Sequence, residues 1–136
     1  MLGTSPEKNV FRMIDAMARG RKDEALRLLH NLLQDGASEM SLLAMITDQL
    51  EIMLTACEMK DEGRRLAEIQ KTLAGGYLGR NKRISEYRTK RALESGSRLG
   101  TSRLRAALAG GYKAEKSIKS GLMPGRLALE YFIGSM

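Results

Sequence analysis

The segment SEMSLLAMITDQLEIMLTACEMKDEG, residues 38–63, is the longest stretch of helical periodicity in the 136-residue chain. Ser38 opens it and Gly63 closes it, and both are residue types that mark helix ends. Between them, apolar residues recur at three- and four-residue spacing: Leu42, Leu43, Ile46, Leu50, Met53, Leu54 and Cys57. The pattern predicts a long central helix around which the rest of the chain packs.

Shorter amphipathic segments flank this helix on both sides. Ser5-Pro6-Glu7 is a typical helix start, and this helix and a second one from about Lys22 to Gly36 are expected to form a hairpin. Four further helices are predicted at about residues 65–74, 80–95 and 101–121, with Thr101 or Ser102 as a cap, and from Pro124 onward. We therefore predict an all-α fold, a compact bundle of about six or seven helices. Residues 1–5 are expected to be a tail or a cut end, and residues 6–136 a single domain.

Composition argues against several classes of site. The chain has one cysteine, Cys57, and one histidine, His30, which rules out an internal disulfide and a cysteine- and histidine-based zinc site. Cys57 is expected to be a buried thiol and His30 a structural residue at a helix edge. No run approaches the ~20 apolar residues of a membrane span, and the N-terminus lacks the apolar core of a signal peptide. We expect a cytoplasmic protein.

The glycine-rich segments do not have the sequence of a nucleotide site. GGYLGRNK (75–82) and GSRLGTSR (96–103) lack the Gly-Lys-Ser/Thr ending that holds phosphates and magnesium in a P-loop. LAGGY occurs at 73–77 and again at 108–112, a repeat that we interpret as coincidence. Within the second copy, Gly110-Gly111 should mark a position where the helix is less stable or where a neighbouring segment approaches its backbone closely. We expect no intrinsic enzymatic activity, no cofactor and no small-molecule substrate.

Charge is divided unevenly along the chain. Residues 1–61 hold seven Lys/Arg and ten Asp/Glu (7 − 10 = −3), and residues 62–136 hold sixteen and six (16 − 6 = +10). The stretch RNKRISEYRTKR (80–91) alone carries six basic residues, on a predicted helix whose narrow buried edge is Ile84, Tyr87, Ala92 and Ser95. It is expected to be mainly a solvated helix face, with phosphate contact as its second interpretation. Candidate contacts to DNA phosphates are Arg80, Lys82, Arg83, Arg88 and Lys119.

Two stretches carry a family resemblance, NVFRMIDAMARGRKDEALRLLHNLL (9–33) and AEKSIKSGLMPGRLALEYFI (114–133). Their order and spacing resemble the collar domain of the delta subunit of bacterial DNA polymerase III, part of the clamp loader, over about residues 5–136. The residues that match the family pattern are Asn9, Phe11, Asp15, Ala16, Gly20, Ala25, Leu26, Lys119, Gly121, Arg126, Leu127, Ala128, Leu129 and Glu130. Residues 60–100 match only loosely.

The resemblance implies a non-catalytic oligomerisation module of a nucleotidyltransferase complex, without the two ATPase-like domains that precede the collar in the family. It implies the ATPase subunits and delta-prime as partners, with weak contact to primed DNA. Residues 119–124, the turn that carries a DNA-facing aromatic residue in some members, hold none here. The implied subunit interface comprises Tyr87, Leu127, Tyr131 and Phe132, and some Met and Leu positions of the long helix are expected to be partly exposed.

The alternatives from the residues alone are a small helix-turn-helix DNA-binding regulator using residues 65–95 and, more remotely, a helical enzyme.

Overall fold

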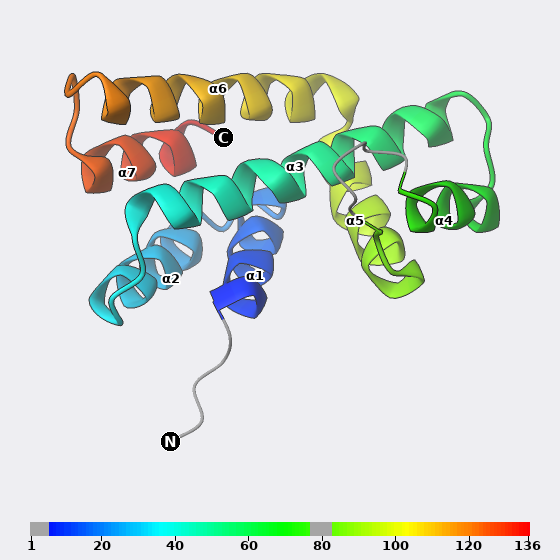
Figure 1. The fold of residues 1–136 in the computed structure, drawn as a ribbon, viewed down its shortest axis with the longest axis horizontal. Helices are drawn as coiled ribbons and strands as arrows, with labels where there is room; N and C mark the ends of the chain where they lie inside the picture. The colour runs from blue at the N-terminus through cyan, green and yellow to red at the C-terminus, as the bar shows by residue number, and fades with distance from the viewer. Residues whose placement is uncertain (1–5, 77–82) are drawn as a thin grey trace.

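The computed structural model describes residues 6–76 and 83–136, and within these ranges the chain forms seven α-helices and no strand (Figure 1). The prediction of an all-α bundle is confirmed. The helices are α1 (Pro6–Ala18), α2 (Lys22–Gln34), α3 (Glu39–Asp61), α4 (Leu66–Ala74), α5 (Glu86–Leu99), α6 (Thr101–Lys119) and α7 (Gly125–Ser135).

Helix α3 crosses the middle of the molecule and contacts α1, α4, α5, α6 and α7 (Figure 1). Its buried positions cover a broad side of the helix, slightly more than half of its circumference: Leu42, Leu43, Ile46, Gln49, Leu50, Ile52, Met53, Ala56, Cys57 and Met59. The prediction of a central helix is confirmed. The expected partial exposure of its Met and Leu side chains is largely wrong, since only Met40, Met45 and Leu54 are half-buried.

Helix α3 is also the one helix in the described residues whose length and composition would suffice to cross a membrane, with a mean hydropathy of 1.3. This corrects the expectation that no segment approaches such a span. Half of the apolar window is buried inside the domain. Packing against the neighbouring helices accounts for the apolar composition, because a central helix has few positions that face water.

Two helical hairpins pack against α3. One is α1 with α2, the other is α6 with α7, and α2 also contacts α7, so the first and last hairpins touch. Helix α1 begins at Pro6, and the hydroxyl of Ser38 accepts a hydrogen bond from the backbone N–H of Ser41 (3.2 Å), which caps α3. The predicted helix ends are confirmed by glycines with positive φ, namely Gly20, Gly36, Gly63 and Gly121.

Two helix starts differ from the prediction. Helix α5 begins at Glu86, after Ser85, whose hydroxyl accepts from the backbone N–H of Arg88 (3.1 Å). Residues 83–85 are therefore not helical, while 80–82 lie outside the described residues. At the start of α6 neither Thr101 nor Ser102 is the cap, because the chain turns at Gly100 with φ 86° and no side-chain hydrogen bond.

The glycine pair in α6 marks a close approach of helices, as predicted. A Cβ atom at Gly111 would lie 2.6 Å from Cγ2 of Thr47 on α3 and 3.3 Å from the Phe132 ring on α7. The two LAGGY copies have different structures: Leu73 and the residues after it end α4, whereas 108–112 lie in the interior of α6. Only 73–76 of the first copy lies in the described residues. The interpretation of this repeat as coincidence is confirmed.

Candidate protein-interaction surface

Helix α7 has apolar side chains on two faces. Its inner face, formed by Ala128, Leu129, Phe132 and Ile133, is buried against α6, α2 and α3. On the outer face Leu127 is 50% exposed and Tyr131 is 70% exposed. These two residues are four apart, so they lie on the same side of the helix, one turn from each other. We call Leu127 and Tyr131 the α7 outer face.

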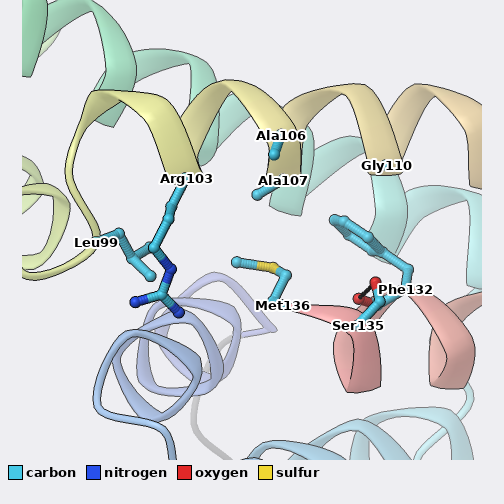
Figure 2. A pocket seen from close by; sticks show the side chains of 8 residues that line it. All are labelled: Leu99, Arg103, Ala106, Ala107, Gly110, Phe132, Ser135 and Met136. Carbon is cyan, nitrogen blue, oxygen red and sulfur yellow. Dashed lines mark hydrogen bonds between the residues drawn. The ribbon is translucent and has the colours of Figure 1, made fainter.

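Phe132 does not belong to that outer face, which corrects its assignment to a subunit interface. The side chain is 2% exposed, and its ring lies against Gly110 and Gly111 of α6. Figure 2 shows the ring between α6 and α7, beside a small cavity of about 180 Å³ that Leu99, Arg103 and Met136 also line. Phe132 therefore stabilises the domain from inside and has almost no surface for a partner.

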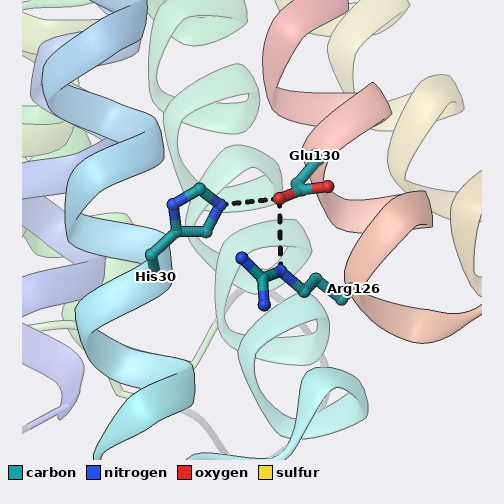
Figure 3. A network of polar contacts seen from close by, with 3 residues as sticks. All are labelled: His30, Arg126 and Glu130. Atoms are coloured by element: carbon teal, nitrogen blue, oxygen red, sulfur yellow. Dashed lines mark hydrogen bonds and ion pairs between the residues drawn. The ribbon is translucent and has the colours of Figure 1, made fainter.

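A polar network fixes α7 against α2 (Figure 3). Nε2 of His30 lies 2.6 Å from Oε2 of Glu130, and Nε of Arg126 donates to the same oxygen at 3.3 Å. The hydrogen bond with His30, followed by that with Arg126, lowers the pKa of Glu130 below its ordinary value. Further along α7, Nζ of Lys22 donates to the carbonyl of Gly134 at 2.7 Å. These bonds fix the orientation of α7 and keep its outer face directed away from the core, and they give His30 the structural role that was predicted.

The candidate DNA contacts divide into two groups. Arg83 and Lys119 are exposed, although Lys119 lies 3.8 Å from Glu115 on the same helix. Arg88 is instead only 32% exposed and contacts Gln49 (3.2 Å), Asp48 (3.6 Å) and the ring of Phe11 (5.2 Å to its centroid). These contacts within the domain count against Arg88 as a DNA contact, which stays a prediction. Arg80 and Lys82 lie outside the described residues.

Sequence reasoning missed a polar junction between α1 and α5. Asp15 accepts hydrogen bonds from Nη2 of Arg91 (3.0 Å) and from the hydroxyl of Ser95. Arg91 also donates to the hydroxyl of Tyr87 at 3.2 Å, and Tyr87 is 70% exposed rather than part of a buried edge. The only available signal was Asp15 itself, an acid within an otherwise apolar part of α1. Its partners lie 76 and 80 residues away, so no local pattern predicts them.

The helix pair at 65–95 does not have the geometry of a helix-turn-helix module. Residues 75–85 separate α4 from α5, whereas such modules join their helices with a turn of about 3–4 residues. Helix α5 is also covered by α1, α3 and α6, and its buried residues include Thr89, Ala92, Ser95, Gly96 and Leu99. The opposite side of α5 is exposed, at Tyr87, Lys90, Glu94 and Arg98, so it is the long connection to α4 that counts against the regulator.

Comparison with known proteins agrees with this arrangement. The profile of the family described as DNA polymerase III delta subunit, C-terminal domain, matches residues 7–136. The chain belongs to this family. The recognition made from the motifs at 9–33 and 114–133 is thereby confirmed.

The chain is similar to part of two longer proteins. The chain is similar to DNA polymerase III subunit delta of Bacillus subtilis (strain 168), with 22% identity over 133 residues that cover 98% of this chain and 36% of the relative. It shares its fold with the DNA clamp loader delta protein of Bacillus subtilis, with a TM-score of 0.85 and 20% identity over 99% of this chain and 37% of the other. The chain thus spans little more than a third of the length of these relatives.

Proposed function

We propose that this domain is a non-catalytic, subunit-joining part of a DNA polymerase III delta subunit, which acts in clamp loading during DNA replication. Its partners are the collar domains of the ATPase subunits and of delta-prime, with weak contact to primed DNA, and the site of action is the cytoplasm. Family membership supports the clamp-loader context. The subunit-joining role is supported by one observation, the α7 outer face, because apolar side chains held outward on a fixed helix are typical of protein interfaces.

The lack of catalytic chemistry is part of the proposal. In the residues that the structure describes, no group of three or more His, Cys, Asp and Glu side chains could hold a metal ion. The segment at 96–103 forms the tight joint between α5 and α6, where a Cβ at Gly96 would lie 2.6 Å from the Cys57 sulfur. Gly96 lies inside α5 and only Gly100 separates α5 from α6, so this segment offers no loop that could wrap around phosphates, which supports a role in assembly rather than in nucleotide chemistry.

The proposal is tested by co-elution on size exclusion with the collar domains of the ATPase subunits and delta-prime from the same organism. We expect Tyr131→Ala to weaken association by ~30-fold, since truncation of a buried interface aromatic costs about 2 kcal/mol or more, and Leu127→Ala to weaken it less. Both should leave the helical circular-dichroism signal intact, because neither side chain is in the core.

The matched control is Leu66→Ala on α4, which removes another exposed leucine (36%) at the opposite end of the molecule (Figure 1). It should leave association unchanged. Lack of association of the unaltered chain at micromolar concentration would contradict the proposal. So would equal losses from Leu66→Ala and Tyr131→Ala.

A further inference from the structure

A groove of about 440 Å³ lies between α1 and α5, away from the α7 outer face. We call it the α1–α5 groove, and its principal residues are Phe11, Arg12, Ile14, Tyr87, Arg88 and Arg91. Ile14 and Met53 of the core form part of its floor, and Tyr87, Arg12 and Arg91 stand exposed at its rim. An apolar floor with a rim of aromatic and arginine side chains has the composition that favours protein partners.

The cations of the groove are held in place by contacts within the domain. Arg88 lies over the ring of Phe11 and reaches Gln49 and Asp48. Arg91 lies 6.0 Å from the centroid of the Tyr87 ring and bonds Asp15. Side chains fixed in this way lose little conformational freedom when a partner binds, which raises affinity.

Positive charge exceeds negative charge in the groove. Lys8, Arg12, Arg88 and Arg91 line it, against two carboxylates: Asp15 in the lining, which pairs with Arg91, and Asp48 behind it, which pairs with Arg88. Arg12 is exposed and forms no ion pair with any other residue in the described part of the chain. The groove therefore attracts a negatively charged occupant, while its floor requires that the occupant also carry an apolar group.

These two requirements favour an acidic polypeptide over a nucleic acid. Binding of single strands depends on bases that stack on open aromatic rings. Here Phe11 and Tyr87 each already have a guanidinium over the ring, and the floor between them is aliphatic. An acidic segment with an apolar side chain satisfies both the rim and the floor.

We propose that the α1–α5 groove binds an acidic segment of a partner protein, which inserts an apolar side chain between α1 and α5 and pairs its carboxylates with Arg12 and the neighbouring cations. This binding does not depend on the subunit-joining role of α7. It is measured on this chain alone, so failure of one proposal leaves the other standing.

The test uses labelled synthetic peptides and fluorescence anisotropy. The probe is a short peptide of Asp and Glu with one Phe and one Leu at its centre. One comparison peptide has Ser in place of the two apolar residues, and another has Lys in place of the acids. We expect the probe to bind with a Kd on the order of 10–100 µM and both comparison peptides to bind at least about tenfold more weakly. The methyl NMR signals of Met53 and Ile14 should shift with the probe, because both residues line the floor.

Substitutions locate the site. Arg12→Glu and Tyr87→Ala should each weaken binding of the probe about tenfold or more. The matched controls are Lys90→Glu, an exposed cation on α5 that does not line the groove, and Tyr112→Ala, an exposed tyrosine on α6, and both should leave binding unchanged. Thermal melts of each variant check that the fold is retained.

Three outcomes would overturn the proposal. The first is equal binding of the probe and the peptide without apolar residues, which would show simple charge attraction. The second is an equal loss from Lys90→Glu and Arg12→Glu. The third is tighter binding of a single-stranded oligonucleotide that displaces the probe, which would make the groove a nucleic-acid site.

Discussion

Tyr131 and Phe132 are adjacent in the chain and similar in chemistry, yet Tyr131 is exposed and Phe132 is buried. One step along a helix rotates a side chain by about 100°, so the two rings point in different directions. The Phe132 ring fits inside because Gly110 and Gly111 of α6 have no side chains and leave space for it. Neighbours also decide the position of Arg88, a basic residue in a basic stretch, whose guanidinium contacts Asp48 and Gln49 and is only partly exposed.

At this scale the Glu130 network makes stability depend on pH. The pKa of Glu130 is lowered in the folded state, mainly by the hydrogen bond with His30. Its contribution to the free energy of unfolding is therefore fully present above the pKa that Glu130 has in the unfolded chain, and it is lost as pH falls through the lower pKa of the folded state. We expect Glu130→Gln to lower the Tm near neutral pH and to lower it progressively less as pH falls below the ordinary pKa range of a glutamate. Thermal melts across this range measure the difference.

The control for this prediction is Glu115→Gln on α6. Glu115 pairs with Lys119 within its own helix and does not join two elements. Its Tm difference from the unaltered chain should stay small at every pH, because exposed pairs of this kind contribute little. An effect of Glu130→Gln that grows as pH falls would contradict the sign argued here.

At the scale of the helices, most boundaries followed from the sequence because their causes are local. Gly20, Gly36 and Gly63 end helices through their own backbone freedom, and apolar spacing defines the helix that each one ends. The exceptions were α5, which begins at Glu86, later than predicted, and α6, where Gly100 rather than a hydroxyl residue begins the helix. The interaction surfaces were harder to predict, since the partners of Arg91 and Ser95 lie on a helix 76 and 80 residues away.

The close packing of α6 on α3 and α7 predicts that alanine substitutions at two adjacent glycines change the stability of the domain in opposite directions. Gly110→Ala should stabilise the domain by about 0.5–1 kcal/mol, because alanine favours the helix and the nearest atom, in the Phe132 ring, lies at an ordinary 3.4 Å. Gly111→Ala should destabilise it by about 1–2 kcal/mol net, since its Cβ would lie 2.6 Å from Thr47. Urea denaturation of both variants measures this, and stabilisation by Gly111→Ala as well as by Gly110→Ala would show that the close approach is unimportant.

At the scale of the whole molecule, the excess of positive charge lies in the helices of the second half of the chain. Helices α1 to α3 come from the half with a net charge of −3, and α4 to α7 from the half with +10. Part of the basic character is used internally, as with Arg88 and Arg91. Arg83 and Lys119 remain exposed, so any attraction for a polyanion depends on dispersed surface cations.

This distribution predicts weak DNA binding without sequence preference. We expect a Kd of roughly 10⁻⁴ to 10⁻⁶ M at physiological salt for two unrelated duplexes alike, measured by anisotropy. Arg83→Glu and Lys119→Glu should each reduce the slope of log K against log salt by about 1, as loss of one phosphate contact does. Arg27→Glu, an exposed position on α2 in the acidic half, is the control. Strong preference for one duplex would instead favour a regulator.

The contact between the first and last hairpins constrains how the domain folds during synthesis. Helix α2 is complete at Gln34, but its partners in α7, Glu130 and Gly134, are translated only after residue 124. At roughly 5–20 residues per second, α2 waits on the order of 5–20 s with that side uncovered. Helix α1 can cover part of α2 at once, but the side of α2 that packs against α7 stays open to water until the last helix is made, so the first hairpin reaches its final packing only when synthesis of the domain is complete.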